Sequence, residues 1–235
     1  MKLSGRRKDI YDILCEKKRV SVAHLAKGLF VSEMTVRRDL AEMEKQGFLK
    51  RYRGGAILHD EMNLLPLSQR MFLEEEEKRE LAQKAQKYLC DGISVYIDSS
   101  STCQFIIPHI KKFSHVKIIT NSVKAVLIAS KLHLPCFLIG GEYYEQDMCL
   151  VGSVSEEIAA RINVDVAFFT AQGFSEEGVI SDSDIEQTSV RRIVMRNAKK
   201  RIFLFEKTKL GKKYLHTLCS AADADEVILC DGGGQ

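Results

Sequence analysis

The chain has 235 residues, 45% of them hydrophobic and 29% charged, which is the composition of an ordinary globular protein and length enough for two domains. Its net charge is +3, but residues 1–60 alone carry +6, which leaves −3 for the remainder. This asymmetry restricts any binding of nucleic acid to the N-terminal part.

Seven cysteines are scattered along the chain without a C-x-x-C pair, which favours reduced core cysteines over a disulfide framework or a zinc site. The six histidines show no metal-ligand spacing, and we expect neither a metal nor a cofactor. The N-terminus has no apolar leader-like run, and no apolar run reaches the length of a membrane span. We therefore expect a cytoplasmic protein that does not bind membranes.

Two apolar patterns predict the first helices. Residues 6–16 place Ile10, Ile13 and Leu14 at helical spacing. Ser21 is a candidate N-cap for a short second helix, because its hydroxyl can accept a backbone N–H of the first turn. The inward side of that helix is predicted to carry Val22, Leu25, Ala26 and Leu29.

Residues 31–40, with the sequence VSEMTVRRDL, predict a third helix that Ser32 caps and that Gly47 ends. The side predicted to face the core carries Val36, Leu40 and Met43. The outward residues include Glu33, Thr35, Arg37 and Arg38. A helix that buries one side and offers hydroxyl groups and two arginines on another suits a polyanion. Residues 20–39 therefore predict a helix–turn–helix whose second helix reads the major groove of DNA.

Residues 48–52 and 56–58 predict two strands joined by a turn, a basic hairpin of the kind called a wing. Its cations would contact phosphates. The predicted DNA-binding residues are Ser21, Ser32, Glu33, Thr35, Arg37, Arg38, Lys50, Arg51, Arg53 and Gly54. The alternative is that the two arginines only solubilise the helix, with Arg38 and Glu42 forming an i,i+4 pair.

Residues 59–73 have weak periodicity and include Pro66, so they are predicted to be a linker. Residues 74–77 are four consecutive glutamates at the start of a helix that continues to about Leu89. Acidic residues are favourable at the positive end of a helix dipole, and this explains the run better than a metal site does.

Strand and helix patterns alternate from Gly92 onward. The predicted strands are residues 93–97, 116–120, 135–139, 164–170, 201–205 and 227–230. This alternation predicts an α/β domain with a largely parallel sheet.

Small polar residues follow several of these strands, where ligands bind in open α/β sheets. Residues 99–102 suit a phosphate group, and Asp98, Asn121 and the backbone of Gly140 and Gly141 suit sugar hydroxyls. Lys209 would add a point charge, with Arg191 or Arg192 from the preceding helix. The predicted effector-binding residues are Asp98, Ser99, Ser100, Ser101, Thr102, Asn121, Ser122, Gly140, Gly141, Gln172, Gly173, Arg192 and Lys209. The alternative is that each loop is an ordinary turn.

The N-terminal part resembles the winged helix–turn–helix of the DeoR family of bacterial transcriptional regulators. The matching residues are Val31, Ser32, Thr35, Val36, Arg37, Arg38, Asp39, Leu40, Glu44, Gly47, Leu49, Arg51, Gly54, Gly55 and Ala56. The remainder resembles the DeoR-type sensor domain, which is similar in fold to sugar-phosphate isomerases of the ribose-5-phosphate kind. The matching residues there are Glu77, Lys78, Arg79, Asp91, Gly92, Ile97, Asp98, Ser99, Thr102, Thr120, Asn121, Ser122, Gly140, Gly141, Leu150, Val151, Gly152, Gly173, Arg192, Lys209 and Gly211.

This resemblance covers nearly the whole chain and implies a regulator that senses a phosphorylated sugar intermediate and then releases DNA. Three departures stand out. Ser100 replaces the usual Gly, Glu206 and Lys207 replace the usual Asp-Ser pair, and the chain ends at Gln235, before a final helix and strand that many members have.

The sequence thus predicts a DNA-binding domain at residues 1–58, a linker at 59–73 and an effector-sensing α/β domain at 74–235. The expected function is a repressor of a sugar-uptake or sugar-catabolism operon that binds double-stranded operator DNA as a dimer or tetramer. Two alternatives remain open at this point: a transcriptional activator of the same architecture, and a sugar-phosphate isomerase with Asp98 or Glu206 as its base.

Overall fold

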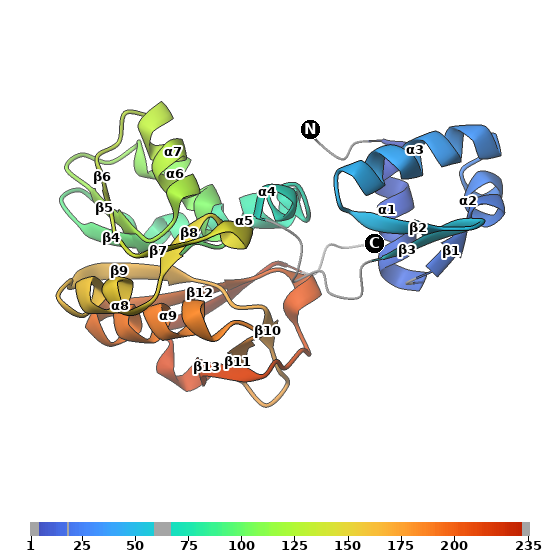
Figure 1. Ribbon diagram of the computed structural model, residues 1–235. Coiled ribbons are helices and arrows are strands. Elements are labelled where there is room, and N and C mark those ends of the chain that lie inside the picture. The colour runs from blue at the N-terminus through green and yellow to red at the C-terminus, as the bar shows by residue number, and fades with distance from the viewer. Residues whose placement is uncertain (1–4, 18, 59–66, 232–235) are drawn as a thin grey trace. The chain divides into compact units, whose positions relative to one another are not determined.

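The structure is a computed structural model that describes residues 5–17, 19–58 and 67–231. It divides into two compact units, Met1–Leu73 and Glu74–Gln235, named below the N-terminal unit and the C-terminal unit, and Figure 1 labels their elements. Of the predicted linker, residues 59–66 lie outside the described residues. The rest of it is ordered: Leu67–Arg70 forms α4, and Leu73 packs into the core of the N-terminal unit.

The N-terminal unit has the predicted helix–turn–helix followed by a hairpin. Its helices are α1 (Arg6–Lys17), α2 (Val22–Gly28) and α3 (Glu33–Lys45), and its hairpin strands are β2 (Leu49–Tyr52) and β3 (Gly55–Leu58). An additional strand, β1 (Arg19–Ser21), pairs with β3 and completes a three-stranded antiparallel sheet. Three residues are too few to show the alternation that identifies a strand, so the sequence did not reveal β1.

Local signals place the ends of these helices where the sequence predicts them. Ser21 caps α2 and Ser32 caps α3, each by accepting a backbone N–H of the first turn, at 3.1 Å and 3.2 Å respectively. Gly47 follows the end of α3 with a φ of +75°, a conformation that favours glycine. Between these ends, Val36, Leu40 and Met43 are buried in the core as predicted.

A buried carboxylate fixes α3 against α1. Asp39 on α3 is 2% exposed, and its two oxygens accept hydrogen bonds from Arg6 at 2.6 Å and Arg7 at 3.2 Å. Burial alone would raise the pKa of Asp39, but the hydrogen bonds from the two guanidinium groups outweigh it and hold that pKa below its ordinary value. Because all three side chains must stay in place, the angle at which α3 is presented is fixed.

The C-terminal unit is built on a six-stranded sheet, which Figure 1 shows with helices on both sides. In spatial order the strands are β14 (Glu226–Leu229), β12 (Ala198–Phe205), β9 (Val164–Phe169), β4 (Ser94–Ile97), β5 (Lys117–Thr120) and β6 (Cys136–Leu138). Every neighbouring pair is parallel, which confirms the predicted fold class.

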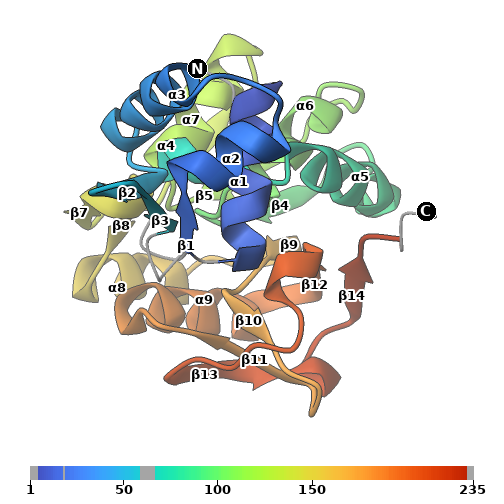
Figure 2. The same cartoon turned by 90° about the vertical axis from the view of Figure 1, so that its right-hand side faces the viewer.

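The central strands bury side chains on both faces, as strands of a covered parallel sheet do. One face packs on α5 (Glu75–Ala85), α6 (Ile107–Ile110) and α7 (Val123–Lys131). The other packs on α8 (Ser153–Ala160), α9 (Ile185–Asn197) and a small sheet of β10 (Gly173–Phe174), β11 (Val179–Asp182) and β13 (His216–Ser220). Figure 2 shows α9 running beside this small sheet. A separate hairpin consists of β7 (Glu142–Tyr144) and β8 (Cys149–Val151).

The order of strands creates a switch point at β4 and β9. The chain passes from β4 outward to β5 and β6, and then returns to β9 on the other side of β4. In open α/β sheets the crevice for a ligand opens beyond the carboxyl ends of the strands at such a point.

In the described part of the chain, no helix is both long and apolar enough to cross a lipid bilayer. No three His, Cys, Asp or Glu residues there are grouped so that they could hold a metal ion.

Asp39→Asn should lower the free energy of unfolding of the N-terminal unit by about 1–3 kcal/mol, because Arg6 and Arg7 lose a charged acceptor. The native pKa of Asp39 is lowered, so its contribution is present above the ordinary carboxyl pKa of about 3.9 and is lost as the pH falls through the native pKa. Hydrogen exchange of the amides of α1 and α3 in the full chain measures both effects.

The matched control is Glu33→Gln, which removes an exposed pair with Arg37 and should change stability by less than about 0.5 kcal/mol. Equal effects of the two substitutions would contradict the structural role given to Asp39.

Candidate nucleic-acid interface and effector site

The helix–turn–helix presents the predicted DNA-binding residues to solvent. All of them are exposed except Thr35, which is half-buried and whose hydroxyl lies 2.9 Å from that of Ser32. The buried side of α3 faces the core, so its other side is free to lie along a groove of DNA. The hairpin cations lie on the same unit, and the role of α3 in reading DNA stays a prediction.

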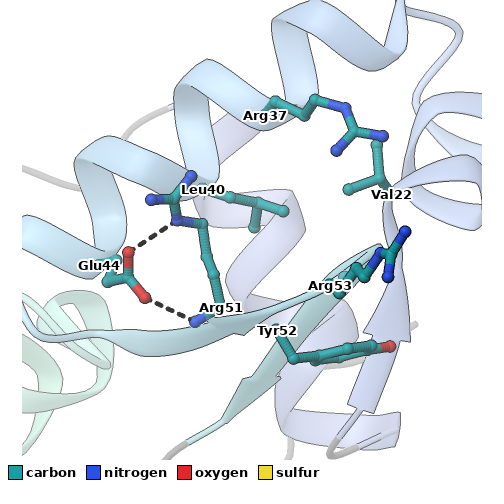
Figure 3. Close-up of a pocket in the computed structure, with 8 residues that line it drawn as sticks. Val22, Arg37, Leu40, Glu44, Arg51, Tyr52 and Arg53 are labelled. Carbon is teal, nitrogen blue, oxygen red and sulfur yellow. Dashed lines mark hydrogen bonds and ion pairs between the residues drawn. The ribbon is translucent and has the colours of Figure 1, made fainter.

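A groove of about 320 Å³ separates α3 from the hairpin. Figure 3 shows Arg37 projecting from α3 and Arg53 projecting from the hairpin on either side of it. Its other lining residues are Val22, Leu40, Glu44, Arg51, Tyr52 and Gly55. Gly55 is required there, because a Cβ would lie 2.3 Å from the carbonyl oxygen of Val20.

The cations around this groove differ in how far they are already neutralised. Arg51 is held by Glu44, which accepts its backbone N–H at 2.8 Å and its side-chain Nε at 2.7 Å, and both bonds lower the pKa of Glu44. Arg37 makes only an exposed pair with Glu33, at 3.1 Å, which a phosphate can replace. Arg38 and Arg53 make no ion pair with any described residue, so their charges are open to a ligand.

The structure does not form the alternative pair between Arg38 and Glu42. The carboxylate of Glu42 instead accepts a hydrogen bond from the side-chain amide of Gln46, at 2.9 Å. Arg38 therefore extends from α3 without an intramolecular partner among the described residues.

In the C-terminal unit, the loop that follows β4 is buried. Asp98, Ser99, Ser100, Ser101 and Thr102 are each at most 4% exposed, as are Asn121 and Ser122 after β5. Ser100 Oγ accepts the backbone N–H of Cys103, where a 3-10 helix begins. The post-strand residues are thus part of one polar layer at the carboxyl end of the sheet and do not form separate surface turns.

Arg191 is the central cation of this layer. Its guanidinium donates to Asp98 at 3.0 Å, to Asp182 at 2.6 Å and to the side-chain carbonyl of Gln187 at 3.0 Å. Burial opposes its charge, but the two carboxylates outweigh burial and raise the pKa of Arg191. The same Gln187 oxygen accepts the hydroxyl of Ser99 at 3.0 Å. The cluster joins β4, β11 and α9.

A second ionic cluster surrounds Glu206, directly after β12. Glu206 accepts the hydroxyl of Thr102 at 2.6 Å and pairs with Lys209 at 2.8 Å and Lys78 at 3.7 Å. Burial alone would raise the pKa of Glu206, but Lys209 and Lys78 outweigh it and lower that pKa to about 2. Lys209 also donates to Thr170, at 3.0 Å. The predicted phosphate ligands Thr102 and Lys209 are thus brought together around a carboxylate of the protein itself.

Among the described residues, two buried acceptor atoms in this layer have neither a hydrogen bond nor an ion pair, whereas a third without a hydrogen bond, Glu206 Oε2, is paired with Lys209. One carboxylate oxygen of Asp98, Oδ2, and the side-chain carbonyl of Gln104, Oε1, are buried without a hydrogen bond. Gln104 uses its amide nitrogen on Ser99 and Ser122. Native proteins rarely leave such atoms unpaired, and each of these two can accept a hydrogen bond. Asn121, in contrast, uses both of its side-chain groups: its Oδ1 accepts the hydroxyl of Tyr96, and its amide nitrogen donates to the carbonyl of Leu150.

Several predicted effector residues have other structural roles. The carbonyl of Gly140 accepts the hydroxyl of Ser155, and a Cβ on Gly141 would lie 2.0 Å from that hydroxyl, so the lack of a side chain at Gly141 leaves room for α8. Gly173 allows close approach of the Lys212 carbonyl. Gln172 contacts the ionic layer through its backbone N–H, which donates to Asp182.

The structure places Arg191 in the polar layer and directs Arg192 elsewhere, to the backbone carbonyl of Thr217 on β13. The helical periodicity of the sequence could have distinguished the two arginines. Arg191 shares the buried side of α9 with Gln187, Val190 and Val194. Asp147, which accepts the amide of Gln187, comes from the turn between β7 and β8, and no motif in the sequence pointed to it.

Arg191→Met should destabilise the C-terminal unit by about 3–5 kcal/mol, because it leaves the buried carboxylates of Asp98 and Asp182 without their cation. Arg192→Met is the matched control and should cost no more than about 1 kcal/mol, since it loses one bond at an exposed position. Urea unfolding of the full chain, followed by hydrogen exchange of C-terminal peptides, separates the two. Similar losses for both variants would contradict the assignment.

Two family patterns match the chain: "DeoR-like helix-turn-helix domain" matches residues 6–62, and "DeoR C terminal sensor domain" matches residues 73–230. The lactose phosphotransferase system repressor of Staphylococcus epidermidis is 27% identical over 94% of this chain and 89% of its own length. The glycerol-3-phosphate regulon repressor of Escherichia coli is 24% identical over 97% and 90%.

Among solved structures, ribose 5-phosphate isomerase A of Methanocaldococcus jannaschii is similar with a TM-score of 0.44 and 20% identity, over 58% of this chain and 54% of that one. These two relatives match almost the whole chain and are named repressors, so the isomerase alternative is set aside. With both of its units matched, the chain belongs to the DeoR family of transcriptional regulators.

Proposed function

We propose that this DNA-binding regulator represses an operon for sugar uptake or catabolism and that a phosphorylated sugar releases it from its operator. The names of two relatives support the class of operon: one represses a lactose phosphotransferase system and the other a glycerol-3-phosphate regulon. We further propose that it acts in the cytoplasm as a homo-oligomer, because a helix–turn–helix reads repeated half-sites through a symmetric assembly.

The open charges of the N-terminal unit support operator binding. Arg38 and Arg53 carry no intramolecular ion pair among the described residues, and Arg37 is held only by an exposed one. A DNA phosphate between α3 and the hairpin would therefore be attracted by these arginines, and no strong contact within the protein would have to break. We infer that Thr35 and one of the two α3 arginines contact base edges, as side chains of a recognition helix do.

The two buried acceptors of the C-terminal unit carry the effector proposal. Asp98 Oδ2 and Gln104 Oε1 accept no hydrogen bond from the residues that the structure describes, and both lie in the segment that follows β4, beside the switch point of the sheet. Hydroxyl groups of a sugar are donors of the kind these oxygens require. Because burying an acceptor without a donor is unfavourable, a polyhydroxy ligand would gain affinity by supplying it.

Lys209 and Thr102 support an anionic group on the same ligand. Both now contact Glu206, so a phosphate that binds them competes with this carboxylate. The neighbouring 3-10 helix Lys207–Lys209 is tied to the start of α5, because Glu77 accepts the backbone N–H of Lys207 at 3.0 Å and Lys78 pairs with Glu206. We propose that displacement of Glu206 is transmitted to α5, which begins the C-terminal unit immediately after Leu73.

Replacing both Arg37 and Arg38 with Ala should weaken binding to DNA by about 2–4 kcal/mol, roughly 30-fold or more, and should flatten the dependence of affinity on salt. Fluorescence anisotropy with a duplex selected from a random pool by the full chain measures this. Arg161→Ala with Arg196→Ala removes the same charge from exposed sites of the C-terminal unit and should leave affinity unchanged. Equal losses in both double variants would refute the role of α3.

A thermal-shift screen against sugar phosphates should identify compounds that stabilise the chain, since a ligand bound at about 100 times its Kd adds about 2.7 kcal/mol. In Lys209→Gln this stabilisation by phosphorylated sugars should be lost, while DNA binding without effector is retained. Lys207→Gln is the control, because it removes the same charge from an exposed side chain only two residues away from Lys209. An undiminished shift in Lys209→Gln would place the anionic group of the effector elsewhere.

A further inference from the structure

Two large apolar side chains lie exposed beside the start of α3. Phe30, in the turn before the helix, is 95% exposed, and Met34, in its first turn, is 75% exposed. They flank the capping residue Ser32 and occupy the end of the helix that enters the major groove in helix–turn–helix proteins. Neither side chain belongs to the core of the N-terminal unit.

The backbone at Phe30 makes this exposure costly. The N–H of Phe30 returns to the carbonyl of Lys27 and that of Val31 to the carbonyl of Ala26, a helix stop that needs a left-handed residue. Phe30 supplies it with a φ of +53°. Glycine or asparagine normally fills such a position, and a bulky aromatic residue there is an outlier. Because the ring gains no packing in return, the folded unit itself does not explain why phenylalanine is present.

Met34 is directed away from the core by the geometry of the helix. It lies on the side of α3 opposite Val36, Leu40 and Met43, and in angular position it falls between Arg37 and Arg38. Any surface that meets these arginines must therefore also meet Met34. The charge around Met34 indicates which kind of partner binds there. Two neighbouring arginines, on an N-terminal part of charge +6, favour a polyanion over an apolar protein surface.

We propose that Phe30 and Met34 are specificity-determining residues that contact the C5-methyl groups of thymines in the major groove of the operator half-site. This inference rests on the proposed binding of operator DNA through α3. A thymine methyl is the apolar group that the major groove offers, and aromatic and aliphatic side chains read it by direct contact. The strain at Phe30 is then stored at a functional site, where such outliers concentrate.

The test uses the full chain and a duplex that it selects from a random pool. Thymines of the selected half-site are replaced one at a time by deoxyuracil, which removes only the methyl group. For the unaltered chain, at least one replacement should weaken binding about threefold to tenfold. For the variant with Phe30→Asn and Met34→Ala, binding to the original duplex should be weaker by a similar factor, and the same replacement should cause no further loss.

Two additional readouts separate base contact from other effects. The dependence of affinity on salt should be unchanged in the variant, because no phosphate contact is lost. Phe30→Asn alone should raise the midpoint of thermal unfolding by roughly 2–4 °C, because asparagine tolerates the left-handed conformation. Leu215→Ala, at an 82% exposed position of the C-terminal unit, is the control and should leave DNA affinity unaltered.

Three results would overturn the proposal: equal binding of thymine and deoxyuracil duplexes by the unaltered chain, unchanged affinity of the variant, or loss of self-association in the variant with DNA binding intact. The last would assign this surface to a protein contact. None of these results would touch the proposed binding of DNA by Arg37 and Arg38, which fails only if their own substitution leaves affinity intact.

Discussion

Arg191 is the side chain on which the arrangement of the C-terminal unit depends. Its guanidinium is buried, and a buried charge is stable only where it is paired and hydrogen-bonded. Asp98 at the end of β4 and Asp182 at the end of β11 meet this requirement, so α9 must lie where one side chain reaches both. The contacts of Arg191 thus connect β4, β11 and α9 within the polar layer, and they position the carboxylate of Asp98, whose Oδ2 accepts no hydrogen bond from the described residues.

The N-terminal unit follows the same principle with the charges reversed. There the buried group is a carboxylate, Asp39, and two arginines of α1 satisfy it. This contact partly neutralises Arg6 and Arg7 and holds α3 against α1, while Arg38 has no ion pair among the described residues. In both units a buried ionic contact positions the functional element, and the exposed or unpartnered groups beside that contact remain available for a ligand.

Periodicity, capping serines and the stop at Gly47 sufficed to predict the helix–turn–helix, because those signals are local. The parallel sheet followed equally from its alternating pattern. The sequence could not predict contacts between distant segments. Examples are the contact of Asp147 with the cluster of Arg191, the contacts of Glu206 with Thr102 and Lys209, and the pairing of Arg19–Ser21 with β3. Arg192 was predicted as an effector-binding residue in place of Arg191. The helical periodicity of α9 could have pointed to Arg191, because Arg191 lies on the buried side of that helix. The left-handed turn at Phe30 gave no signal, because phenylalanine is not a residue expected there.

The central claim is that one chain couples a sugar phosphate to DNA, which requires the ligand to favour one of two states. Coupling of this kind is reciprocal, so the most direct measurement is the Kd of the full chain for its selected duplex, with and without a saturating concentration of the sugar phosphate that stabilises it most. The account predicts that DNA affinity falls by about 5- to 150-fold and that the duplex weakens binding of the sugar phosphate by the same factor. A DNA affinity that is unchanged by the bound sugar phosphate would contradict it.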